Sequence, residues 1–287
     1  MWRAASTWCS RGVRHEAVVN VAVIGGGRMG AGIAQVFLAR GDHVTVQEPR
    51  AEAARRRIAE GLAVAESKGV ADKEAALARL TMGTVPAEAE LVIEAVPEDP
   101  ALKADVLGEA ESRVSAQTVL ASNTSSLSIA ELAAALQRPE HLIGLHFFNP
   151  VPVQPLVEIV VTPSTPGDVL ERARQYVERL GKTSVVVNDS PGFATSRLGV
   201  LLGLEAIRMV EEGVASPEDI DAAMALGYGH PMGPLRLSDL VGLDVRLAIA
   251  EYLHARLGPR FEPPRLLRDK VAAGELGRKS GKGFYQW

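Results

Sequence analysis

A glycine-rich turn between an apolar strand and a helix constrains the fold of this chain more than any other sequence feature. Residues 18–24 form a short run rich in β-branched side chains, which is typical of a buried strand. The pattern G-x-G-x-x-G follows at once over residues 25–30, and a helical stretch then continues to Arg40. This order of strand, glycines and helix predicts a dinucleotide-binding βαβ unit.

The glycines of this turn have distinct expected roles in holding a pyrophosphate. Gly25 permits the tight turn, Gly27 lets the backbone approach the phosphates, and Gly30 lets the helix pack closely on the strand. Free N–H groups at the start of the helix then face the phosphates. The candidate cofactor-binding residues of the loop are Gly25, Gly26, Gly27, Arg28, Met29 and Gly30.

An acidic residue at the end of the second predicted strand indicates which nicotinamide cofactor is used. Glu48 lies 18 residues after Gly30. A carboxylate at this position accepts hydrogen bonds from a ribose 2′-hydroxyl and repels a 2′-phosphate, which favours NAD over NADP. Arg50 lies close by and offers the alternative of a phosphate contact. The sequence therefore predicts NAD, with Glu48 as its ribose-binding residue.

Strands and helices alternate with short connections through the first two thirds of the chain. Strands are expected at 18–24, 44–46, 91–93, 118–121, 142–147, 156–161 and 183–187, and helices at 31–40, 51–68, 72–79, 100–114, 128–136 and 166–180. The alternation predicts an α/β fold with a Rossmann-type, doubly wound, mostly parallel sheet. The strand at 156–161 follows a proline-punctuated turn directly, so it is expected to return antiparallel.

Beyond residue 188 the strand signals disappear and helices are expected at 193–212, 217–227, 235–257, with an interruption near Gly242, and 264–273. We therefore divide the chain into a cofactor-binding domain at 18–188 and an all-helical C-terminal domain at 189–287. Residues 1–17 contain three arginines, several Ser and Thr and one acid, Glu16. They are expected to be a disordered extension or an overhang from an early start codon, with an organellar transit peptide as the alternative.

Composition excludes several classes of protein. The chain of 287 residues has a formal net charge of −4 and a pI of about 5.9, which argues against nucleic acid as a partner. Its single cysteine, Cys9, rules out a disulfide within the chain and a cysteine-based metal site, and no metal is expected. No apolar run is long enough to span a bilayer, so no membrane association is expected.

A histidine and a glutamate are expected to meet across the proline-punctuated turn. His146 ends the strand at 142–147, and the carboxyl ends of strands are where doubly wound sheets place ligands. If the returning strand pairs symmetrically about Pro152, Glu158 lies opposite His146, with the two Cβ atoms about 5 Å apart. A carboxylate beside the imidazole orients the ring and stabilises its charged form, which predicts a general base and its orienting acid.

With these residues in view, the chain resembles the 3-hydroxyacyl-CoA dehydrogenase family, which includes 3-hydroxybutyryl-CoA dehydrogenases. The resemblance covers about residues 18–287. The segments that carry it are VIGGGRMGAGIAQ, IEAVPED, ASNTSSLSI, GLHFFNPVPVQPLVEIV, DSPGFATSR, HPMGPLRLSDLVGLD and GRKSGKGFY, in this order along the chain.

The resemblance implies a role for each matching residue. It makes His146 the general base, Glu158 its orienting acid and Ser125 a substrate contact near the nicotinamide. Further cofactor contacts are implied at Glu98, Lys103, Ser125, Asn149 and Lys279, and Lys68 matches, more loosely, a lysine that meets the phosphates of coenzyme A. The family commonly has Asn where this chain has Ser196. A catalytic contact of Ser196 with the substrate oxygen is therefore expected only if its shorter hydroxyl takes the place of the Asn amide.

The implied activity is the reversible, NAD-dependent oxidation of a short-chain (S)-3-hydroxyacyl-CoA to the 3-ketoacyl-CoA, as in fatty-acid β-oxidation. The resemblance also implies a homodimer formed by the helical domain, and the sequence suggests a cytoplasmic location, or a mitochondrial matrix if residues 1–17 are a transit peptide. Two alternatives stay open: a dehydrogenase of the same superfamily that acts on a hydroxy or sugar acid without CoA, and a non-catalytic, crystallin-like NAD-binding protein.

Overall fold

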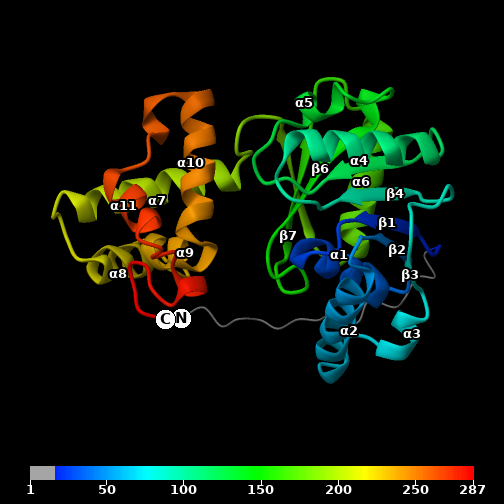
Figure 1. The fold of residues 1–287 in the computed structure, drawn as a ribbon, viewed down its shortest axis with the longest axis horizontal. Helices are drawn as coiled ribbons and strands as arrows, with labels where there is room; N and C mark the ends of the chain where they lie inside the picture. The colour runs from blue at the N-terminus through cyan, green and yellow to red at the C-terminus, as the bar shows by residue number, and fades with distance from the viewer. Residues whose placement is uncertain (1–16) are drawn as a thin grey trace.

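An eight-stranded sheet dominates the first part of the chain in the computed structural model, which describes residues 17–287 (Figure 1). The strand order is β3-β2-β1-β4-β5-β6-β7-β8, and the only antiparallel pair in it is β6 with β7. The predicted fold class is confirmed. The strands are β1 (Asn20–Ile24), β2 (His43–Gln47), β3 (Leu80–Met82), β4 (Leu91–Glu94), β5 (Val119–Ser122), β6 (Leu142–Phe147), β7 (Leu156–Val161) and β8 (Thr183–Asn188).

Helices cover both faces of the sheet, and alternate side chains of the strands point to each face. In β1, Val21 and Val23 join the cluster of buried apolar side chains contributed by α1, α2 and α6, whereas Ala22 and Ile24 join that of α4 and α5. Because β1 lies between β2 and β4, strand order reverses at β1, and its carboxyl end is a ligand-binding switch point. The helices are α1 (Arg28–Ala39), α2 (Ala51–Ser67), α3 (Lys73–Leu77), α4 (Pro100–Arg113), α5 (Ile129–Ala133), the 3₁₀ turn η1 (Pro139–His141) and α6 (Gly167–Arg179).

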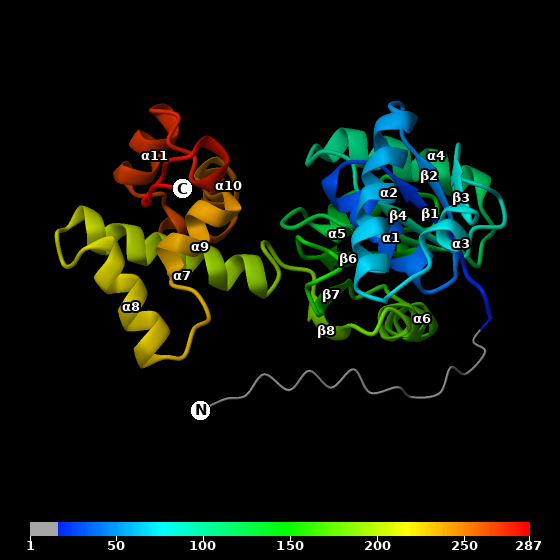
Figure 2. The same cartoon turned by 90° about the horizontal axis from the view of Figure 1, so that it is seen from below.

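A helical lobe follows the sheet, and α7 leads into it from the end of β8 (Figures 1 and 2). A third cluster of buried apolar side chains fills this lobe and joins α7, α8, α9, α10 and α11. The lobe consists of α7 (Thr195–Glu211), α8 (Pro217–Gly227), α9 (Pro234–Val241), α10 (Leu243–Leu257), η2 (Pro259–Phe261), α11 (Arg265–Ala272) and η3 (Arg278–Ser280). The change from sheet to helices after Asn188 agrees with the expected arrangement, while independent folding of two domains stays a prediction.

Two details differ from the expected elements, and a third agrees with them. Residues 80–82, for which no element is expected, form the short edge strand β3, which pairs parallel to β2. The helix expected over 193–212 begins only at Thr195, because Gly192 and Phe193 have positive φ angles of 75° and 50°, which helical backbone does not allow. The expected interruption near Gly242 is present, where a φ of 107° separates α9 from α10. Residues 1–16 of the expected N-terminal extension, which include Cys9, lie outside the described residues.

Candidate active site

The glycine-rich turn has the geometry that a pyrophosphate-binding loop requires. Gly25 has a φ of 99°, and a Cβ there would lie 2.8 Å from the carbonyl oxygen of Ala95. A Cβ on Gly30 would lie 1.8 Å from the carbonyl oxygen of Gly25. Gly27, the N-cap of α1, has nothing within 4 Å of its Cβ position, so that space is open for a ligand. The loop therefore fits the pyrophosphate of NAD at the start of α1.

Glu48 lies beside this loop, as expected, and is hydrogen-bonded to it. Its Oε2 accepts a hydrogen bond of 2.8 Å from the Gly26 N–H, and its Oε1 accepts one of 3.1 Å from the Arg50 N–H. Burial raises the pKa of the Glu48 carboxyl, but these two hydrogen bonds and the nearby guanidinium groups outweigh burial and hold the pKa below its usual value. The group is thus an ionised acceptor at neutral pH, which suits a ribose hydroxyl and disfavours a 2′-phosphate.

Replacing Glu48 with Ala is expected to weaken NAD binding by about 10- to 100-fold, because it removes a charged acceptor for the ribose. Discrimination against NADP is expected to fall at the same time. Titration of NAD and NADP, followed by protein fluorescence or calorimetry, measures both effects. Glu52→Ala, in the exposed first turn of α2, is the matched control. An unchanged NAD affinity in Glu48→Ala would remove Glu48 from ribose recognition.

His146 and Glu158 meet as the expected register requires. In the antiparallel pair of β6 and β7, His146 lies directly opposite Glu158, and the His146 Nδ1 lies 2.8 Å from the Glu158 Oε2. The imidazole is buried, and its ring packs at a centroid distance of 4.3 Å against Phe148 and 5.9 Å against Phe193. Its Nε2 forms no hydrogen bond within residues 17–287. With Nδ1 held by a carboxylate, Nε2 is the nitrogen left to exchange a proton with a ligand.

Glu158 is completely buried and receives further hydrogen bonds from the start of α7. The Thr195 Oγ1 donates to Oε2 at 2.7 Å, and the backbone N–H groups of Thr195 and Ala194 donate to Oε1 at 2.9 and 3.2 Å. Burial raises the pKa of the Glu158 carboxyl, but the hydrogen bonds from His146 and Thr195 outweigh burial and hold the pKa below its usual value. The carboxylate therefore stays ionised and can stabilise a protonated imidazole.

A strained residue brings the start of α7 to this carboxylate. Phe193 has a φ of 50°, which is rare for a side chain of this size and costs roughly 1–3 kcal/mol. Its ring is buried in the apolar cluster of α4 and α5 and also contacts the ring of His146. Packing of this ring holds the backbone in the turn that aims the N–H groups of residues 194 and 195 at Glu158.

A buried charge network lies under the Ser125 loop. The Lys103 Nζ lies 2.8 Å from the Glu94 Oε1 and 3.2 Å from the Glu98 Oε2, and the Lys103 and Glu94 side chains are 1% and 0% exposed. The Ser122 hydroxyl donates to Glu94, and the Ser125 N–H donates to Glu98. Charges buried this deeply are stable only when paired, so the network fixes the carboxyl ends of β4 and β5. The Ser125 hydroxyl itself forms no hydrogen bond to any described residue.

The remaining expected site residues lie in several parts of the fold. Asn149 lies at the exposed start of the turn between β6 and β7, and Ser196 lies in the first turn of α7, next to Thr195. Lys68 is the exposed C-cap of α2. Lys279 lies in the helical lobe, where its Nζ pairs with Asp244. Cofactor or substrate contacts of these residues, and of Lys103 and Glu98, stay predictions.

Asp239 anchors the C-terminal segment that carries Lys279. This carboxylate is fully buried and accepts three hydrogen bonds of 2.9 Å, from the N–H groups of Phe284 and Tyr285 and from the Trp287 Nε1. Asp239→Ala is expected to lower the free energy of unfolding by about 2–3 kcal/mol, because it leaves buried donors unpaired. Urea unfolding measures this loss, with the exposed Asp269→Ala as the control. Equal midpoints for the two variants would contradict the anchoring role.

Sequence reasoning missed two residues that hold the candidate site. Thr195 stands in the quoted segment DSPGFATSR directly before Ser196, and a hydroxyl at a helix start was the available signal. Glu94 ends strand β4 in IEAVPED, and an acid at the carboxyl end of a parallel strand was the available signal there.

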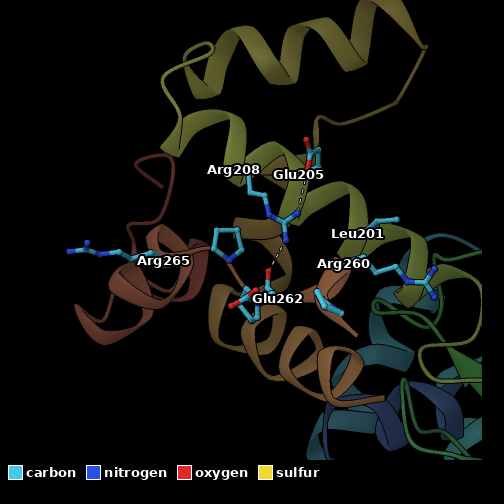
Figure 3. Close-up of a pocket in the computed structure, with 9 residues that line it drawn as sticks. Leu201, Glu205, Arg208, Arg260, Glu262 and Arg265 are labelled. Atoms are coloured by element: carbon cyan, nitrogen blue, oxygen red, sulfur yellow. Dashed lines mark hydrogen bonds and ion pairs between the residues drawn. The ribbon is translucent and has the colours of Figure 1, made fainter. Parts of the chain in front are cut away.

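A hollow in the helical lobe lies away from the site around His146. Figure 3 shows this cavity of about 510 Å³, whose lining comes from α7, η2 and α11 of the helical lobe and the loop between η2 and α11, with no residue from the sheet. The guanidinium of Arg208 in its wall is already bound by Glu205 and by the carbonyl oxygen of Glu262. The cavity therefore contributes nothing to the site around His146.

The described part of the chain contains no group of three or more His, Cys, Asp or Glu side chains that could hold a metal ion. Among the helices of residues 17–287, none combines the length and the apolar character that a membrane crossing requires.

Comparison with family models divides the chain in two. Residues 20–190 match the model of the 3-hydroxyacyl-CoA dehydrogenase NAD-binding domain, and residues 192–287 match the model of the 3-hydroxyacyl-CoA dehydrogenase C-terminal domain. The two matches together span nearly all of the described residues.

Individual relatives agree with the family models. The chain is 45% identical over 284 residues to a 3-hydroxybutyryl-CoA dehydrogenase of Mycobacterium tuberculosis, with 95% of this chain and 99% of the relative covered. The crystal structure of FadB2 from M. tuberculosis matches with a TM-score of 0.90 and 45% identity, over 95% of this chain and 100% of that one. The (S)-3-hydroxybutyryl-CoA dehydrogenase PaaH1 of Ralstonia eutropha matches with a TM-score of 0.89 and 37% identity, over 94% and 99%.

Proposed function

This chain belongs to the 3-hydroxyacyl-CoA dehydrogenase family, and we propose that it oxidises short-chain (S)-3-hydroxyacyl-CoA, such as 3-hydroxybutyryl-CoA, to the 3-keto product with NAD. The observation that carries the proposal is a contact of 2.8 Å between His146, near the carboxyl end of β6, and the buried, ionised Glu158 of β7. The substrate is supported by the relatives from M. tuberculosis and R. eutropha, which are 3-hydroxybutyryl-CoA dehydrogenases.

Each protein group has a defined task in this reaction. The Nε2 of His146 takes the proton of the substrate's C3 hydroxyl as general base. Glu158 keeps Nδ1 protonated and stabilises the resulting imidazolium, while Thr195 keeps the carboxylate in place. Ser125, and Ser196 in place of the family's Asn, position the substrate oxygens. When bound, NAD supplies the hydride acceptor, and the glycine loop with Glu48 holds it.

The reverse reaction gives a direct assay. The purified protein is expected to oxidise NADH with acetoacetyl-CoA, and to reduce NAD with (S)-3-hydroxybutyryl-CoA but not with its (R) isomer. Free 3-hydroxybutyrate tests the alternative of a dehydrogenase that needs no CoA. Turnover of the free acid at a kcat/KM equal to that of the thioester would overturn the proposal, and NAD binding without any turnover would favour the non-catalytic alternative.

The oligomeric state, the cellular location and the pathway are also part of this proposal. Exposed apolar side chains on the helical lobe support a homodimer through this lobe, because apolar side chains that are exposed together are typical of protein–protein contact surfaces. They are Leu198, Val214, Leu226 and Tyr228, with exposed fractions of 66%, 59%, 88% and 80%. Light scattering at micromolar concentration measures the mass. We also propose a cytoplasmic location, which is supported by the bacterial origin of these relatives, and a place in fatty-acid β-oxidation, which is supported by the 3-hydroxyacyl-CoA substrate of the proposed reaction.

A further inference from the structure

A buried arginine of the helical lobe has no partner for its charge. Arg246 lies in α10 and is only 8% exposed. Its Nε is enclosed without a hydrogen-bond partner, and no acid of residues 17–287 forms an ion pair with its guanidinium. Asp244, two positions earlier, lies on another face of α10 and pairs with Lys279. The guanidinium is therefore a buried cation that lacks a counter-ion among the described residues.

Such a charge calls for an anion that the described part of the chain does not supply. Burial lowers the pKa of Arg246 to about 10, so the guanidinium is still protonated at neutral pH. A buried ion without a partner is destabilising, and the planar N–H groups of a guanidinium match the two oxygens of a carboxylate. The surroundings of Arg246 are thus suited to a carboxylate that arrives with a ligand.

The guanidinium lies against α7, one turn beyond Ser196. A Cβ on Gly199 would lie 3.5 Å from the Arg246 Nη1, and one on Gly203 would lie 3.1 Å from the Oγ of Ser238 in α9. Positions 196, 199 and 203 share one face of α7, and this face is turned toward α9 and α10, which Figure 1 shows beside it. Gly199 is only half-buried, so the space beside the guanidinium is not closed by a side chain.

This face of α7 begins at the residues proposed for the chemistry. Thr195, directly before Ser196, donates to Glu158, which pairs with His146. Ser196 and Gly199 lie about 4.5 Å apart along the helix axis, a span of a few carbon atoms. An acyl chain whose C3 oxygen lies between His146 and Ser196 can therefore extend along α7 and place its far end at Arg246.

We propose that Arg246 binds a carboxylate at the distal end of the acyl chain, so that the preferred substrates are short 3-hydroxyacyl-CoA thioesters that end in a carboxylate. This inference rests on the proposed function for the position of the C3 oxygen. The unpaired charge of Arg246 is independent of that function.

The experiment uses two substrates that differ only at the distal end. 3-Ketoadipyl-CoA and 3-ketohexanoyl-CoA have the same chain length and the same CoA, but the first ends in a carboxylate and the second in a methyl group. The ratio of their kcat/KM values with NADH is measured for the wild type, Arg246→Met and Arg246→Lys. Arg265→Met, whose side chain at the start of α11 is 86% exposed, is the matched control. The ratio cancels any loss of folded protein and any contact with CoA.

We expect a ratio of at least about 10 in the wild type and in Arg265→Met, and a ratio lowered about 10- to 100-fold in Arg246→Met, because a hydrogen-bonded charge is lost. Arg246→Lys should give an intermediate ratio, since an ammonium retains the charge but not the paired N–H groups. A wild-type ratio of one or less would overturn the proposal. The same ratio in Arg246→Met as in the wild type would also overturn it, and a loss of mass in light scattering of this variant would then assign the counter-ion to a second copy of the chain.

Failure of the proposed function gives a different result. If neither thioester nor acetoacetyl-CoA is turned over by the wild type, the proposed function fails. Calorimetric titration of 3-ketoadipyl-CoA and 3-ketohexanoyl-CoA into the wild type and Arg246→Met then decides the role of Arg246. Weaker binding of the carboxylate-ended thioester alone in Arg246→Met would support the proposal, and equal affinities in the two proteins would overturn it.

Discussion

Replacing His146 with Gln is expected to lower kcat by about 10²–10⁴-fold while NAD binding persists. The imidazole is the group whose free nitrogen, Nε2, can take the substrate's proton, because Nδ1 is already held by Glu158. Glutamine fills a similar volume and can donate to the Glu158 carboxylate, but it cannot act as a base. The loss should therefore fall on kcat in steady-state assays with acetoacetyl-CoA and NADH.

Two controls separate this loss from damage to the fold. His43→Gln changes an exposed histidine at the start of β2 and should retain wild-type turnover. Titration of NADH into His146→Gln should give an affinity near that of the wild type, because the cofactor loop lies on β1 and α1. Turnover within a few-fold of the wild type would exclude His146 as the base.

Replacing Glu158 with Gln is expected to have the second-largest effect, a loss of about 10²–10⁴ in kcat. The Glu158 Oε2 accepts from both the His146 ring and the Thr195 hydroxyl, and an amide at this position removes the charge that stabilises the imidazolium. An amide also brings an N–H donor to a place where the His146 ring and the Thr195 hydroxyl already donate. This favours the ring tautomer with an unprotonated Nδ1, whose protonated Nε2 cannot act as the base. The effect should exceed that of removing the Thr195 hydroxyl, which donates to the carboxylate and not to the imidazole.

Thr195→Val serves as the matched comparison, because it deletes one hydrogen bond to Glu158 and keeps the shape and the backbone donors. We expect a loss of about 5- to 20-fold in kcat for it, in line with one hydrogen bond to a charged group. If Glu158→Gln retained more activity than Thr195→Val, the charge of Glu158 would have no part in the mechanism.

The pairing of His146 with Glu158 could be predicted because it depends on local geometry alone. A short turn centred on Pro152 sets the register of an antiparallel pair, and register decides which side chains are opposite. The glycine loop was also predictable from local geometry, because a Cβ on Gly30 would collide with the carbonyl oxygen of Gly25 within the same βα unit. In both cases the interacting residues lie no more than 12 positions apart.

The contacts that complete the site could not be predicted because they join distant segments. Thr195 reaches Glu158 across 37 positions, through a backbone turn that depends on positive φ at Gly192 and Phe193. No periodicity marks a phenylalanine for that conformation, since packing of its ring imposes it. The edge strand β3 was missed because its three residues are too few to show alternation.

The central claim is that His146 and Glu158 act as one unit, and a double-mutant cycle in kcat tests it most directly. Because the acid is proposed to work through the ring, adding Glu158→Gln to His146→Gln is expected to cost less than about a further threefold. If the two losses instead multiplied, with the double variant slower than either single variant by the full factor of the other, the carboxylate would act independently of the imidazole and the mechanism would be wrong.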